Sequence, residues 1–202
     1  MTTQPARAPH APGTSQGCGR PRGERYFSTF ELILLALFSS LVVVSKIVLR
    51  LPLRLPGHSG IFWMAILIVA RGLVPKPGAL SLVGLTSGLL AAFLGLGDQG
   101  AIDTFLSYLI SGVAVDVMAL FLGGVDNVVV AGLTGIVGNV AKMLAKAAMA
   151  VLFQIPAGFI AFGLLYSFIT NSVAGALGGV LGWLILRALR QAGFFAYLAE
   201  KR

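Results

Sequence analysis

The residues most able to do chemistry are polar side chains set inside long apolar segments. Asn139, Lys142 and Lys146 follow at spacings of three and four residues, which places them on one face of a predicted helix. A lysine ammonium is a compact point charge that binds carboxylates and phosphates. A charge at the centre of a membrane costs roughly 2.5–3.5 kcal/mol on insertion scales, so residues of this kind need a structural or functional reason.

A second polar face is predicted on the apolar segment at 102–122. Asp103, Ser107 and Ser111 recur at every fourth residue of this segment, and Tyr108 lies beside them. Two interpretations of the polar groups remain open. In the structural one, Lys142 pairs with Asp116 or Asp103, and the other lysines extend toward the membrane surface.

In the functional interpretation, the same polar groups line a cavity that is open at one membrane surface. The lysines and amides are concentrated in one half of the predicted helices, which favours this interpretation. The candidate solute-binding residues are Lys46, Asp103, Ser107, Tyr108, Ser111, Asn139, Lys142, Lys146 and Asn171.

Other kinds of chemistry find no support in the sequence. His10 lies in a polar N-terminal arm and His58 is a lone loop residue, so no histidine-based metal site is expected. No phosphate-binding loop, G-x-S-x-G or H-E-x-x-H motif is present. We therefore expect neither an enzyme nor a cofactor.

Composition places the chain in a membrane. Of 202 residues, 57% are hydrophobic and 11% are charged, with a mean hydropathy of +0.91. Soluble domains carry roughly 25% charged residues. The net charge of +8 does not indicate nucleic-acid binding, because most basic residues flank apolar segments. The single cysteine, Cys18, excludes an internal disulfide.

The predicted fold is an all-α polytopic bundle of about six transmembrane helices. Residues 1–26 are expected to be a disordered basic arm, 27–190 the membrane domain and 191–202 a tail. The predicted spans cover residues 30–49, 60–74, 78–96, 102–122, 127–153 and 164–186. Residues 157–163 are interpreted as a loop or partial helix, and 157–168 as a lid, a re-entrant piece or part of the sixth span. Trp63 is predicted to be an interfacial anchor.

The basic residues predict that both chain ends are cytoplasmic. The predicted inner side carries Arg7, Arg20, Arg22, Arg25, Arg71, Lys76, Arg187, Arg190, Lys201 and Arg202. The outer side carries Arg50 and Arg54. In this orientation, the polar residues concentrate in the outer half of the bundle.

Small residues at helical spacing predict close helix packing. The third span carries Gly84, Gly88, Ala92 and Gly95, and the sixth carries Ser172, Gly175 and Gly179. On the first span, Ala36 and Ser40 form a small-xxx-small pair. This pair fits either a contact within the chain or a docking face for another membrane subunit.

These features together resemble the S-component of an energy-coupling factor (ECF) type vitamin transporter. The resemblance rests on the small pair of the first span, the Lys-Pro-Gly-Ala turn at 76–79, the glycines of the third span, and Gly112 with Asp116 on the fourth. It covers nearly all of residues 27–190. The Lys-Pro-Gly-Ala turn is most similar to the branch that includes thiamine-precursor transporters.

The resemblance implies a substrate-capture subunit of the prokaryotic cell membrane. It implies one vitamin-sized solute in an outward-facing cavity, covered by the loops at 50–59, 97–101 and 154–158. It also implies partnership with a membrane T-component, docked at Ala36 and Ser40, and with two cytoplasmic ATPases. Ser40 departs from the more usual A-x-x-x-A pattern. The lysines favour an anionic or zwitterionic solute, while Asp103 and Tyr108 leave a cationic one open.

Two alternatives compete with this hypothesis. A non-transporting scaffold of a cell-envelope complex predicts no polar cavity and lysines paired to aspartates. A small channel predicts polar residues through both leaflets, and the predicted inner half is poor in them apart from Asp116.

Overall fold

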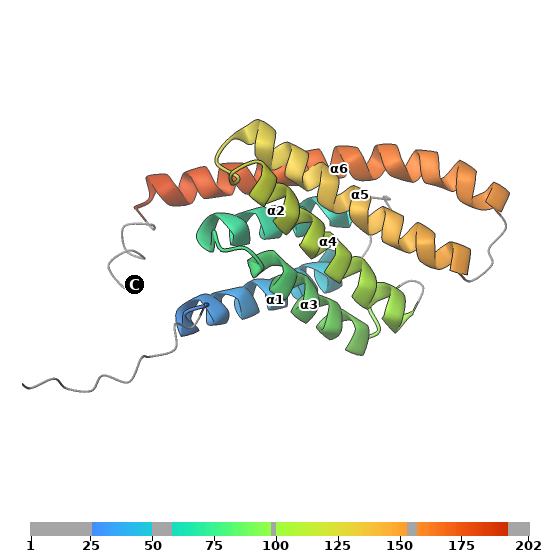
Figure 1. Cartoon of the computed structure of the whole chain (residues 1–202), viewed down its shortest axis with the longest axis horizontal. Coiled ribbons are helices and arrows are strands. Elements are labelled where there is room, and N and C mark those ends of the chain that lie inside the picture. The colour runs from blue at the N-terminus through green and yellow to red at the C-terminus, as the bar shows by residue number, and fades with distance from the viewer. Residues whose placement is uncertain (1–25, 50–57, 98–99, 153–156, 194–202) are drawn as a thin grey trace, which may run out of the picture.

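The computed structural model describes residues 26–49, 58–97, 100–152 and 157–193. These residues form a bundle of helices and contain no β-strand. The helices are α1 (Thr29–Leu49), α2 (His58–Leu73), α3 (Ala79–Phe93), α4 (Ala101–Phe121), α5 (Val128–Leu152) and α6 (Ala157–Gln191) (Figure 1). Four of them, α1, α4, α5 and α6, are long and apolar enough to cross a membrane, and α2 and α3 are shorter apolar helices. The predicted all-α membrane bundle is confirmed.

Most helix boundaries lie within two residues of the predicted spans. Glu31 accepts a hydrogen bond from the backbone N–H of Ser28 at 2.9 Å, which is one of the two bonds of a capping box at the start of α1. The third helix is shorter than predicted and ends at Phe93. Gly95 has a φ of 62° in the turn that follows, so it ends the helix instead of packing on it.

The last helix differs most from the sequence interpretation. Residues 157–163 are neither a separate loop nor a separate piece, because α6 runs unbroken through 35 residues. This stretch contains no proline, so no residue interrupts the helical hydrogen bonds. At 1.5 Å per residue, α6 is about 52 Å long and exceeds a hydrocarbon core of about 30 Å.

Helix α2 forms the centre of the bundle and contacts each of the other five helices. Its Met64, Leu67 and Ile68 are completely buried. Most side chains of α2 pack against other helices, which explains why this helix is apolar around most of its circumference; Phe62 is its exposed large apolar residue. The remaining helices expose large apolar side chains such as Phe93 and Phe121, as lipid-facing surfaces do.

Glycines set the closest helix contacts, as the small-residue pattern predicted. Gly84 of α3 faces Gly112 of α4, and a Cβ at Gly84 would lie 2.7 Å from the carbonyl oxygen of Tyr108. On α6, a Cβ at Gly175 would lie 2.5 Å from the carbonyl oxygen of Gly135 on α5. Backbones therefore touch directly at both crossings.

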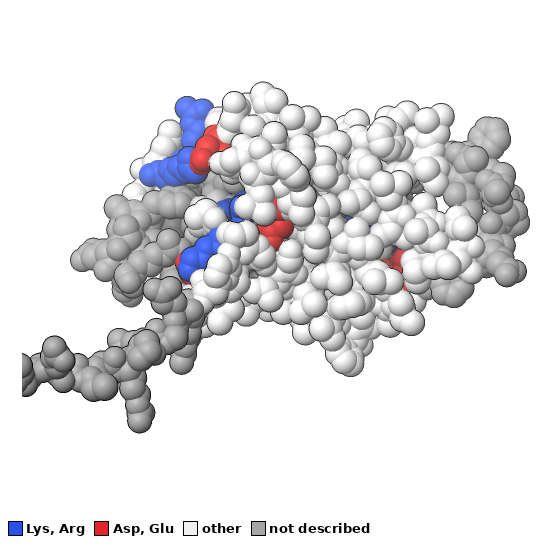
Figure 2. All heavy atoms as spheres, viewed as in Figure 1, with Lys and Arg blue, Asp and Glu red and all other residues white. Residues whose placement is uncertain are grey.

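The charged residues divide the bundle into two ends. The first turn of α1 and the last turn of α6 lie at the same end (Figure 1). Most of the visible Lys and Arg atoms gather there (Figure 2). We call this the basic end and define it by Arg71, Lys76, Arg187 and Arg190. Predictions for residues 1–25, for 194–202 and for most of the three expected cover loops fall outside the described residues.

Candidate functional site

Two lysines and two aromatic rings meet in the half of the bundle away from the basic end. Lys142 on α5 places its Nζ 4.5 Å from the ring centroid of Trp63 and 4.8 Å from that of Tyr108. Lys46 on α1 places its Nζ 5.2 Å from the Tyr108 centroid. These distances fall within the roughly 6 Å range of cation–π attraction. We call Lys46, Trp63, Tyr108 and Lys142 the aromatic–lysine cluster; it joins α1, α2, α4 and α5.

The sequence predicts Trp63 to be an interfacial anchor, and the structure places it elsewhere. Instead of lying at the membrane surface, it is 3% exposed and stands edge-on to Tyr108, with centroids 5.2 Å apart. Its Nε1 donor has no hydrogen-bond partner among the described residues. The orientation of Trp63 within α2, the central helix, explains the difference: Trp63 points into the bundle, whereas the adjacent Phe62 is 46% exposed. Because α2 is apolar around most of its circumference, no periodicity of the sequence predicts this inward orientation.

Asp103 contributes a buried carboxyl group to the same half. It is 2% exposed, and neither carboxyl oxygen has a hydrogen-bond partner within the described part of the chain. The hydroxyl of Ser107, one turn along α4, is likewise without a partner there. Buried polar atoms are nearly always satisfied, so such a group calls for an explanation. A bound polar molecule would satisfy these atoms.

Three other candidate residues already bond to the protein. Ser111 donates to the carbonyl oxygen of Gly138 at 2.6 Å, which links α4 to α5. Asn139 donates to the carbonyl oxygen of Asn171 at 3.3 Å, and Asn171 donates to that of Ser167 at 2.7 Å. The Asn139 bond connects α5 to α6, and the Asn171 bond lies within α6. A role for the three side chains in solute binding stays a prediction.

Lys146 lies one helical turn beyond Lys142 on α5 and is half-buried. The structural interpretation offered Asp116 or Asp103 as the partner of Lys142. Asp116 is instead held by Arg71 at 3.1 Å, at the basic end of the molecule. Asp103 has no hydrogen-bond partner among the described residues. Neither of the two pairings offered for Lys142 is therefore seen among the described residues.

The basic end contains an ionic network that the sequence did not reveal. Lys76, in the turn after α2, contacts the Glu31 carboxylate of α1 at 2.6 Å. Arg71 donates to the carbonyl oxygen of Lys76 at 2.6 Å, besides its contact with Asp116. The Lys-Pro-Gly-Ala turn is therefore attached to α1 and, through Arg71, to α4.

The small pair of α1 is exposed. Ala36 and Ser40 both lie on the outer surface of the helix, and Ser40 donates to the carbonyl oxygen of Ala36 at 3.1 Å. The neighbouring Leu37 and Leu41 are 60% and 45% exposed. Within the described residues the pair is not used for packing, so the alternative of a contact within the chain is not supported.

The overall arrangement matches a solved structure. Structural comparison finds a chain described as the crystal structure of an S-component of an ECF transporter, with a TM-score of 0.65 over 87% of this chain and 95% of that one. The chain has the S-component fold. Sequence identity to that structure is 18%, so the likeness concerns the fold. No protein-family model and no curated protein matches the sequence.

The S-component fold fits the resemblance drawn from the Lys-Pro-Gly-Ala turn and the span pattern. In this S-component-like bundle, the turn lies at the basic end and the aromatic–lysine cluster lies in the other half. Sequence reasoning found Lys46, Tyr108 and Lys142 because charges and polar rings stand out in apolar segments. It did not predict Trp63 to be in the cluster, because tryptophan in a membrane protein is commonly an interfacial anchor.

Proposed function

We propose that the chain is the solute-binding S-component of an ECF-type importer in a prokaryotic cell membrane. The observation that carries the proposal is the S-component fold over most of the chain together with a group of buried, unsatisfied polar atoms in one half. Packing of the helices alone does not require buried polar atoms without hydrogen-bond partners. Trp63, Asp103 and Ser107 carry buried donors and acceptors that have no hydrogen-bond partner among the described residues, which supports a bound polar molecule.

The solute we propose is vitamin-sized and zwitterionic, carrying both an acidic group and a hydrogen-bond donor edge. The ammonium groups of Lys46 and Lys142 suit a carboxylate or phosphate. The two oxygens of Asp103 suit a pair of donors such as an ammonium or an amino group next to a ring nitrogen. The rings of Trp63 and Tyr108 supply apolar walls for the body of the molecule. A purely anionic solute would leave Asp103 unsatisfied.

The partners of the proposed subunit are a membrane T-component and two cytoplasmic ATPases. The chain has no phosphate-binding loop of its own, so the energy for import must come from another subunit. The exposed pair Ala36 and Ser40 allows the backbone of a partner helix to approach α1 closely. We propose this pair as the T-component contact.

The test begins with the purified protein and mass spectrometry of any small molecule that it retains. The affinity of that molecule is then compared between the unchanged protein, Lys142→Ala and Lys46→Ala, the two lysines of the aromatic–lysine cluster. Loss of a charged hydrogen-bond partner costs about 1.5–3 kcal/mol, so affinity should fall roughly tenfold or more. Arg187→Gln removes a charge at the basic end and serves as the control with unchanged affinity.

The alternative, a scaffold subunit of a cell-envelope complex, gives a different outcome. Such a protein would retain no small molecule and would copurify with envelope proteins instead of a T-component and ATPases. If a solute is found but both lysine variants bind it normally, the site has been placed wrongly while the transport role stands.

A further inference from the structure

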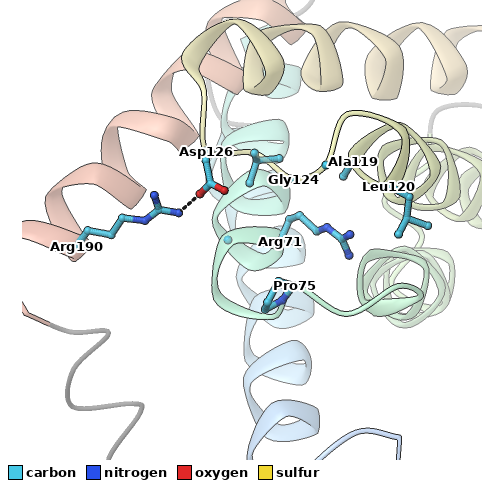
Figure 3. A pocket seen from close by; sticks show the side chains of 10 residues that line it. Arg71, Pro75, Ala119, Leu120, Gly124, Asp126 and Arg190 are labelled. Atoms are coloured by element: carbon cyan, nitrogen blue, oxygen red, sulfur yellow. Dashed lines mark hydrogen bonds and ion pairs between the residues drawn. The ribbon is translucent and has the colours of Figure 1, made fainter.

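Two adjoining cavities open at the basic end, away from the aromatic–lysine cluster. The larger has a volume of about 420 Å³ and lies between the ends of α2, α4 and α6, with Arg71, Pro75, Gly124, Asp126 and Arg190 among its lining residues. Figure 3 shows Arg190 reaching across from α6 toward Asp126, with Arg71 and Pro75 on another wall. This volume is in the range of small-ligand pockets, roughly 300–1,000 Å³.

The smaller cavity has a volume of about 230 Å³ and shares Val125, Asp126 and Arg190 with the larger one. It adds Trp183 and Arg187 of α6. Trp183 donates from Nε1 to the carbonyl oxygen of Asp126 at 2.8 Å. That bond fixes the loop between α4 and α5 against α6, so the wall between the two cavities is a defined surface.

The charges around the cavities leave an excess of one arginine. Arg71 is paired with Asp116, and Arg190 is paired with Asp126. Arg187 lies over the ring of Trp183, 5.5 Å from its centroid, and has no carboxylate partner among the described residues. A guanidinium group has five N–H donors, so an arginine in an ion pair still offers donors to a second oxygen ligand. The pockets therefore favour an anion, and arginine favours phosphate in particular.

The surroundings of the cavities are apolar on the membrane side. Leu120, which lines the larger cavity, is 51% exposed, and the next residue, Phe121, is 84% exposed. On α6, Leu184 and Ile185 follow Trp183 and are 49% and 41% exposed. An occupant that joins a phosphate to an acyl chain would contact both kinds of surface. A free phosphate would use the arginines alone.

We propose that these cavities bind the headgroup of an anionic phospholipid, with the phosphate held at Arg187 and Arg190 and the chains lying along α4 and α6. The basic residues predict that this end faces the cytoplasm, where the membrane leaflet is rich in anionic lipid. Basic pockets between transmembrane helices on that side are suited to such headgroups. The bound lipid would fix the end of α6 relative to the loop at 123–127.

The test uses tryptophan fluorescence, since the chain has two tryptophans, Trp63 in the aromatic–lysine cluster and Trp183 at the smaller cavity. Trp63→Phe leaves Trp183 as the reporter in the full-length protein. Quenching by phosphatidylglycerol with brominated chains is compared with quenching by phosphatidylcholine brominated in the same way. We expect preferential quenching by phosphatidylglycerol, and about a fivefold loss of that preference in Arg187→Gln, the factor that one basic residue near an anionic surface contributes.

Lys76→Gln is the matched control, because it removes one charge at the basic end without lining either cavity. If the preference for phosphatidylglycerol survives in Arg187→Gln, or falls equally in Lys76→Gln, the lipid is attracted by the overall positive charge of the basic end. Either result would overturn the proposed headgroup site. Displacement of phosphatidylglycerol by millimolar inorganic phosphate would assign the pocket to a soluble anion instead. Melting curves of the variants exclude misfolding as the cause.

Discussion

Arg71 on α2 and Asp116 on α4 form a buried ion pair, with Nη1 and Oδ1 3.1 Å apart and both side chains at most 5% exposed. The second carboxylate oxygen accepts hydrogen bonds from the backbone N–H and the hydroxyl of Ser81 on α3. Three helices thus meet at one carboxylate. The geometry satisfies both oxygens, which is the condition under which a buried ion pair is tolerated.

Removing one partner of this pair should destabilise the protein strongly. Arg71→Met leaves the Asp116 carboxylate buried without its counter-ion, and the expected loss is about 3–5 kcal/mol in the free energy of unfolding. The double variant Arg71→Met/Asp116→Leu removes both charges and should recover most of that loss. Unfolding in mixed micelles with increasing denaturing detergent measures the three proteins. Equal stability of the single and double variants would contradict the pairing.

Substitution of Asp103 should weaken solute binding without lowering the stability of the solute-free protein. Without a solute, the buried carboxyl group of Asp103 lacks a partner among the described residues, and such burial costs free energy. Asp103→Asn should therefore leave the solute-free protein as stable or more stable, while solute affinity falls roughly tenfold or more. Melting temperature with and without solute measures both effects.

The control for Asp103 is Ser111→Ala, on the same face of α4. Ser111 already bonds to the carbonyl oxygen of Gly138, so its loss should reduce stability by about 1 kcal/mol with a smaller effect on affinity. If Asp103→Asn destabilised the protein as Ser111→Ala does, its carboxyl group would have a structural partner and not a solute.

The contact between α5 and α6 should not tolerate side chains at its glycines. Gly175→Val would place a Cβ 2.5 Å from the carbonyl oxygen of Gly135, so the two helices must separate. Overpacking of this kind costs about 1–3 kcal/mol, occasionally more. Gly163→Ala on the same helix meets nothing within 4 Å and should be neutral or slightly stabilising. Thermal unfolding of both variants decides the point.

The sequence predicted well what depends on one helix at a time. The apolar segments set the helices to within a few residues, and the spacing of Lys142 and Asp103 placed them in the polar half. What it could not give was which helices are neighbours. The pairing of Arg71 with Asp116, 45 residues apart, depends on how α2 and α4 pack, and a charged residue near a span end is equally well explained by the membrane surface.

Trp63 and α6 illustrate the same limit in different ways. A tryptophan near a helix end is usually interfacial, and only the central position of α2 turns it inward. For α6, the expected break came from the thickness of a membrane, whereas the chain itself has no residue that ends the helix before 191. Helix length follows local hydrogen bonding, and the bilayer does not truncate it.

The surface of α1 gives the last prediction, which rests on the proposed docking of a T-component. Ser40→Leu places a large side chain on the exposed small pair and should abolish copurification with the T-component, since close approach of a partner backbone is then blocked. Ser40→Ala keeps the residue small, removes only its hydrogen bond to Ala36, and should assemble normally or better. Solute affinity should be unchanged in both, because Ser40 lies on the outer surface and the aromatic–lysine cluster faces inward. Assembly of the Ser40→Leu protein at normal yield would place the partner on another helix.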